Sequence, residues 1–151
     1  MEKIIIDSSV IIGHLTRNES CSKLLRLLLA SQREIIVSAA SLFEIYSRKE
    51  FVGGSAEETQ KLTDLLSHFN CIPISNDIAK YAGIYRNWYS SQEGLDLQKY
   101  PLTNELLFVA STAKLLGATI TTLPEKVGHY NSCCTDESPL SGILVFGVPA
   151  N

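Results

Sequence analysis

Short apolar runs alternate along this chain with longer stretches in which apolar residues recur at helical spacing. The short runs are rich in β-branched residues and predict strands over residues 3–6, 34–38, 118–122 and 143–146. A further extended segment, residues 71–74, contains Pro73 and is therefore expected at a sheet edge or at the end of a strand.

Between the predicted strands, the helical spacing and the polar residues that flank it indicate where helices begin and end. Ser8 and Ser9 are candidate caps for the first of these helices, and Gly117 is a typical residue after the end of the last one. The predicted helices cover residues 10–15, 20–31, 39–49, 55–69 and 75–89, and a last one is entered through residues 101–104. Residues 90–100 and 124–141 are predicted to be polar loops.

This alternation of strands and helices predicts an α/β fold with a mainly parallel sheet, and no linker divides residues 1–151 into two domains. Ligands of such sheets bind outside the carboxyl ends of the strands. The residues of interest are therefore Asp7, the segment 38–44 and the stretch 122–125.

The composition excludes several classes of protein. Thirteen basic and sixteen acidic residues give a formal charge of −3, which argues against a protein that coats nucleic acid by bulk charge but allows a nuclease whose acidic pocket is neutralised by metal ions. No apolar run is long enough to span a membrane, and no signal peptide is recognisable, so we expect a cytoplasmic protein with reduced cysteines. The neighbouring Cys133 and Cys134, close to His129, match zinc-ligand spacing poorly.

Two acids follow the first two predicted strands. Asp7 ends the first strand, and Glu44 lies on the helix that begins where the second strand ends. Each has an ordinary alternative role, because Asp7 could cap the next helix and Glu44 could face solvent. Together they suit Mg²⁺ or Mn²⁺, which prefer carboxylates that converge from separate elements, and such a site suits phosphodiester hydrolysis.

Three segments resemble the PIN-domain family, the nuclease fold of the VapC-type toxins. They read IIIDSSVI at residues 4–11, VSAASLFEIY at residues 37–46 and ASTAKLLGATITT at residues 110–122. The resemblance implies a three-layer α/β/α sandwich with a central, mainly parallel sheet. It also implies a Mg²⁺- or Mn²⁺-dependent ribonuclease that forms a homodimer and is held in check by an antitoxin protein.

The chain departs from the family pattern at two acidic positions. The third acid of the family falls near Leu106 here, and the nearest candidates are Asn104 and Glu105, which could instead be a helix cap and a first-turn acid. The fourth acid has Glu125 as its substitute, although an exposed loop glutamate would look the same.

Further residues are candidates for contacts with RNA or with water. The hydroxyls of Ser9 and Thr122 could orient water or phosphate, or could satisfy local backbone groups. Tyr85, Trp88 and Tyr89 could stack on bases, although this spacing more often marks a core or a dimer surface. Basic candidates for phosphate contacts, each also explained as a solvated charge, are Lys126, His129, Arg48, Lys49 and Arg86.

Two hypotheses follow. In the first, the chain is a VapC-type ribonuclease in which Asp7 and Glu44 bind the metal, while Glu105 or Asn104, together with Glu125, completes the acidic cluster. In the second, it is a PIN-like protein that has lost the full acid set, has weak or no activity, and binds RNA or a protein partner. A phosphoacceptor receiver domain is disfavoured, because the acidic pair and the lysine that it needs are not found.

Overall fold

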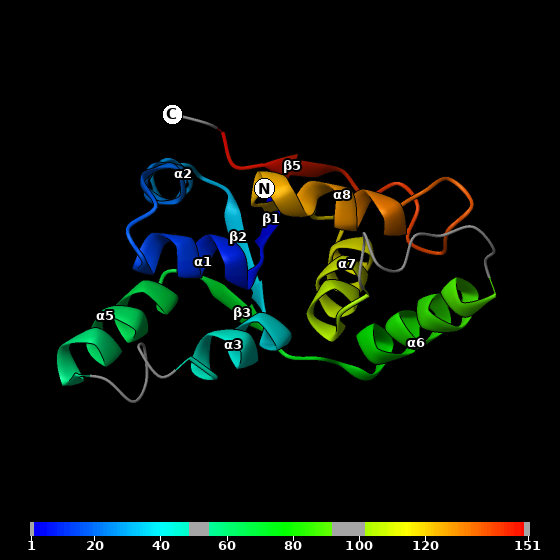
Figure 1. The fold of residues 1–151 in the computed structure, drawn as a ribbon, viewed down its shortest axis with the longest axis horizontal. Helices are drawn as coiled ribbons and strands as arrows, with labels where there is room; N and C mark the ends of the chain where they lie inside the picture. The colour runs from blue at the N-terminus through cyan, green and yellow to red at the C-terminus, as the bar shows by residue number, and fades with distance from the viewer. Residues whose placement is uncertain (1, 49–54, 92–101, 150–151) are drawn as a thin grey trace.

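The computed structural model describes residues 2–48, 55–91 and 102–149, and its centre is a parallel five-stranded sheet (Figure 1). The strand order is β3-β2-β1-β4-β5, and every pair of neighbouring strands is parallel. The strands are β1 (Lys3–Ile6), β2 (Glu34–Ser38), β3 (Asn70–Ile72), β4 (Thr119–Thr122) and β5 (Val145–Gly147). The extended segment around Pro73 was expected at an edge, and β3 is indeed an edge strand.

Helices cover both faces of the sheet. They are α1 (Ser8–Leu15), α2 (Glu19–Ala30), α3 (Ala39–Tyr46), α5 (Ala56–Leu66), α6 (Asn76–Ser90), α7 (Asn104–Leu116) and α8 (Pro124–Cys133). Side chains alternate between the faces of a strand, so Ile4 and Ile6 of β1 join the core under α1, α2, α3 and α5, while Ile5 joins the core under α6, α7 and α8. The predicted three-layer α/β/α sandwich is confirmed.

Polar residues at the strand ends explain where several helices begin. The carboxylate of Asp7 accepts a hydrogen bond from the N–H of Ser9 and caps α1, so Asp7 rather than Ser8 or Ser9 is the cap. Ser38 caps α3 in the same way. At the other end of α7, Gly117 adopts the left-handed conformation (φ 67°) that glycine tolerates best, as its position in the sequence predicts.

The predicted polar loop over residues 124–141 is wrong for its first part, because α8 occupies Pro124–Cys133. Gly128 and the polar residues around it lower the helix propensity of this segment, so propensity alone does not predict α8. The signal was Pro124 at the first helical position, followed by an acid in the first turn. Tyr130 and Cys133, one turn apart, provide its buried face.

The register of the sheet determines which residues meet at its carboxyl edge. Ile6 of β1 pairs with Val37 on one side and with Thr121 on the other. Asp7, one residue later, therefore lies between the ends of β2 and β4. The strand order reverses direction at this point of the sheet, which is where open α/β sheets bind their ligands.

Within the described ranges, no helix is both long and apolar enough to cross a membrane. All four cysteines are free thiols.

Candidate functional site at the carboxyl edge of the sheet

Asp7 is buried at the centre of this edge, and both of its carboxylate oxygens accept hydrogen bonds. Oδ1 accepts from the N–H of Ser9 (3.1 Å) and from the hydroxyl of the same residue. Oδ2 accepts from the hydroxyl of Thr122 (2.6 Å) and from that of Tyr130 (2.9 Å). Only 1% of the Asp7 surface is exposed. A carboxylate offers about four lone-pair positions, so these donors saturate Asp7.

Glu105 lies near Asp7, in the first turn of α7, and its carboxylate is bound by the first residue of α1. The N–H of Ser8 donates to Oε2 (3.0 Å), and the hydroxyl of Ser8 donates to Oε1 (2.8 Å). Burial raises the pKa of Glu105, and the negative charge of Asp7 raises it further, whereas the hydrogen bonds from Ser8 oppose the rise. The structure thus brings two of the predicted acids together.

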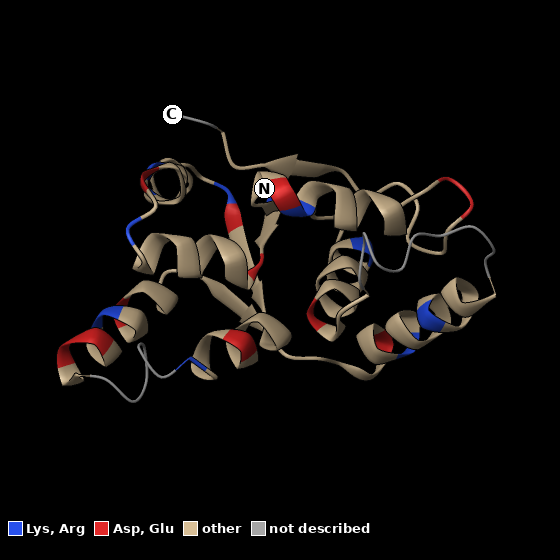
Figure 2. Ribbon diagram, viewed as in Figure 1, with Lys and Arg blue, Asp and Glu red and all other residues tan. Residues whose placement is uncertain are grey.

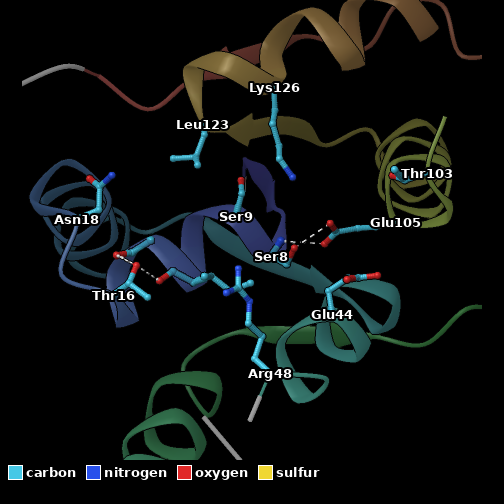
Figure 3. A pocket seen from close by; sticks show the side chains of 12 residues that line it. Ser8, Ser9, Thr16, Asn18, Glu44, Arg48, Thr103, Glu105, Leu123 and Lys126 are labelled. Carbon is cyan, nitrogen blue, oxygen red and sulfur yellow. Dashed lines mark hydrogen bonds between the residues drawn. The ribbon is translucent and has the colours of Figure 1, made fainter. Parts of the chain in front are cut away.

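A cleft of about 470 Å³ opens beside these acids, between α1, α3, α7 and the end of β4 (Figure 3). Glu44 is exposed and lies on its rim. Its lining is Ser8, Ser9, Ile12, Gly13, Thr16, Asn18, Glu44, Arg48, Thr103, Glu105, Leu123 and Lys126. Asp7 is buried and does not belong to this lining, whereas its neighbours Ser8 and Ser9 do.

Two basic side chains face the cleft from opposite sides. Figure 3 shows Lys126 reaching in from α8 and Arg48 reaching in from the segment after α3. Within the described residues, Lys126 has no carboxylate at ion-pair distance. Elsewhere, acidic and basic positions are mixed along α5 and α6 (Figure 2). The structure therefore provides local positive charge at the cleft, although the net charge of the chain is negative.

Two of the predicted ligands lie elsewhere. The side-chain oxygen of Asn104 accepts a hydrogen bond from Arg86 (2.9 Å), and neither residue is part of the cleft lining. Asn104 does not cap α7 either, because the hydroxyl of Thr103 accepts the N–H of Leu106 there. Glu125 is exposed in the first turn of α8 and is not part of the cleft lining.

The remaining candidates also have defined places. Tyr85 and Tyr89 are buried in the core under α6 and α7, so their rings pack against each other and are not open to bases. Trp88 is half-buried beside Tyr85. Lys49 lies outside the described residues. His129 lines a smaller cavity of about 190 Å³, together with Lys126 and Tyr130.

Two residues of the site were missed by sequence reasoning, namely Tyr130 and Ser8. Tyr130 lies in a segment that was predicted to be a loop. The available signal for a buried helix face was the spacing of three residues between Tyr130 and Cys133, both of which are buried. Ser8 was considered only as a helix cap. Ser9 and Thr122 were predicted to orient water or phosphate; their hydroxyls both bind Asp7 and lie 3.3 Å apart.

These residues do not fit a preformed site for a divalent cation. The oxygens of Asp7 are saturated, and both oxygens of Glu105 are engaged by Ser8, which leaves Glu44 as the open carboxylate of the three. In the part of the chain that the structure describes, no three His, Cys, Asp or Glu side chains are grouped so that they could hold a metal ion. A cation could bind at Asp7 only in competition with a protein donor.

Comparisons with known proteins identify the fold. The chain is similar to VapBC2 from Rickettsia felis, whose structure is bound to a DNA fragment from their promoter, with 20% identity, a TM-score of 0.71, and coverage of 97% of this chain and 99% of that one. It is also similar to DNA-bound VapBC from Salmonella typhimurium, with 14% identity, a TM-score of 0.72, and coverage of 99% and 100%.

A toxin-antitoxin complex from Klebsiella pneumoniae matches with 20% identity, a TM-score of 0.59, and coverage of 83% of this chain and 91% of that one. A search of curated proteins found no match. The sequence profile of the PIN domain matches residues 4–123, which is most of the chain. The protein therefore belongs to the PIN-domain family.

Proposed function

We propose that this protein is a VapC-type PIN-domain ribonuclease of low activity, which binds RNA in the cleft and cleaves it weakly. The observation that carries the proposal is the saturation of Asp7 beside a cleft that retains acidic and basic side chains. Because protein donors already bind both carboxylate oxygens of Asp7, a cation has to displace one of them in order to bind there. The cleft nevertheless lies where this fold binds its ligands.

The chemistry of the cleft supports a phosphodiester backbone as the ligand. Lys126 and Arg48 supply positive charge from two sides, and Thr16 and Thr103 supply hydroxyls. Phosphate contacts from lysine and arginine are the main source of affinity for nucleic acids. Any residual cleavage is expected to require Mg²⁺ or Mn²⁺, with Glu44, Glu105 and Asp7 as the nearest carboxylates.

We further propose an antitoxin protein as a partner, a homodimer as the assembly and the cytoplasm as the location. The partner is suggested by the matched structures, which include VapBC assemblies and a toxin-antitoxin complex. The homodimer and the location follow from the family resemblance alone.

RNA binding can be measured by fluorescence anisotropy with a short single-stranded RNA in the presence of EDTA, so that cleavage does not interfere. We expect Lys126→Ala to weaken binding several-fold and to lower the salt dependence by about one phosphate contact. Lys80→Ala, on α6 and away from the cleft, is the matched control and should leave binding unchanged. Equal binding by all three proteins would refute the cleft as the RNA site.

Cleavage is then measured with the same RNA in Mn²⁺. Slow cleavage by the wild type, lost in Asp7→Asn, is the expected result. Fast cleavage at low Mn²⁺ concentration would show a fully active enzyme, and the proposal of low activity would fail.

A further inference from the structure

We propose that Tyr130 is a positioning residue that holds the Asp7 carboxylate in a closed arrangement and thereby lowers its affinity for divalent cations. This inference rests on the proposed function and gives a cause for its low activity. Tyr130 lies on α8, 123 residues after Asp7, and its hydroxyl donates to Oδ2 over 2.9 Å.

The four donors on Asp7 differ in how readily they can leave. The hydroxyls of Ser9 and Thr122 lie 3.3 Å apart, so that each can bond the other when it releases Asp7. Ser9 also lines the cleft, where water replaces a lost partner.

Within the part of the chain that the structure describes, the hydroxyl of Tyr130 has no second partner of this kind. It is 2% exposed, and among the described residues Asp7 is the hydrogen-bond partner of its hydroxyl. If Asp7 turned toward the cleft, the buried hydroxyl of Tyr130 would lose this hydrogen bond, which is unfavourable.

The location of Tyr130 also determines the direction in which it holds Asp7. Its ring packs in the core under α6, α7 and α8, whereas the cleft opens on the side of Ser8, Ser9 and Glu44. The bond from Tyr130 therefore ties Oδ2 to a side chain of this core. Removal of the phenolic hydroxyl takes one of the two donors from this oxygen, leaving the hydroxyl of Thr122, and does not change the shape of the ring.

The test is a calorimetric titration of Mn²⁺ into the full chain, without RNA. We expect Tyr130→Phe to bind Mn²⁺ about tenfold more tightly than the wild type, since one buried hydrogen bond no longer competes. Tyr85→Phe is the matched control, because Tyr85 is also a fully buried tyrosine of the same core and its hydroxyl does not bond Asp7. Its affinity should equal that of the wild type.

Adding Asp7→Asn to Tyr130→Phe should abolish the gain in Mn²⁺ affinity, which would show that the gain depends on the carboxylate of Asp7. If Tyr130→Phe does not fold, as judged by circular dichroism, Thr122→Val removes the other donor on Oδ2 and should tighten Mn²⁺ binding by a smaller factor, because Thr122 releases Asp7 more readily. Equal or weaker Mn²⁺ binding by a folded variant of this pair would overturn the inference. That result would leave the RNA-binding proposal intact, because the latter is measured in EDTA on other variants.

Discussion

Ser8 holds the carboxylate of Glu105 at two points, through its N–H to Oε2 (3.0 Å) and through its hydroxyl to Oε1 (2.8 Å), although 97 residues separate the two positions. The N–H of Ser8 is one of the donors at the start of α1 that have no partner within the helix itself. This end of a helix favours negative charge. Glu105 therefore has a structural role at the start of α1, and that role engages the oxygens that a cation would need.

Glu105→Gln should make the protein more stable at neutral pH, with a Tm about 2 °C higher than that of the wild type. The amide oxygen still accepts a hydrogen bond from Ser8, and the change removes a half-buried charge near Asp7. The raised pKa means that ionised Glu105 destabilises the fold, and this penalty appears as the pH rises above the ordinary value of 4.5. Thermal unfolding from pH 4 to pH 8 measures the difference, which should vanish at the acidic end.

Glu58→Gln, at the exposed start of α5, is the control for that experiment. It should change stability by less than about 0.5 kcal/mol at any of these pH values. A wild type that is more stable than Glu105→Gln at neutral pH would mean that the helix-end attraction outweighs the burial of the charge.

Thr122→Val should destabilise the fold by about 2 kcal/mol, since a buried hydrogen bond to a charged carboxylate is lost. Thr121→Val makes the same chemical change one residue earlier on β4, where no hydrogen bond of the hydroxyl to a described residue is lost. We expect an effect within about 0.5 kcal/mol for this control. Urea unfolding of the two variants provides the comparison, and equal losses would show that the bond to Asp7 contributes nothing of its own.

Leu106→Asp places an acid where the family pattern has one, yet it should unfold the protein rather than restore a site. Leu106 is 5% exposed and packs in the core with residues of α6 and α8. A carboxylate buried there without a partner should cost about 3 kcal/mol or more. Leu106→Met keeps the volume and should cost less than about 1.5 kcal/mol. A folded Leu106→Asp protein with tighter Mn²⁺ binding would contradict this prediction.

Gly13→Ala should destabilise the packing of α1 on α2. A Cβ at Gly13 would lie 2.6 Å from the sulfur of Cys21, which is fully buried. Overpacking of this kind typically costs about 1–3 kcal/mol. Gly83→Ala on α6 meets nothing within 4 Å and should stabilise the helix by about 0.5–1 kcal/mol. Chemical denaturation should therefore give changes of opposite sign in the free energy of unfolding for the two variants. Combining Gly13→Ala with Cys21→Ala should reduce the loss of stability that Gly13→Ala causes.

The sequence by itself determined the layers of the fold and one centre of the site. Short β-branched runs predicted the strands, and alternation with helices predicted a parallel sheet; both are confirmed. Asp7 could be located because it directly follows a strand, and position relative to a strand end is local information. Gly117 after α7 was recognisable for the same reason, since the end of a helix depends on a few neighbouring residues.

Only the tertiary structure decided what surrounds Asp7. Thr122 and Tyr130 reach its carboxylate across 115 and 123 residues, and no local period records such a contact. In the same way, the turn of Glu105 toward Ser8 depends on how α7 packs beside α1, because neighbouring residues in the first turn of a helix face different directions. Residue types predicted which groups could bind a cation, whereas long-range hydrogen bonds determine whether their oxygens are available to it.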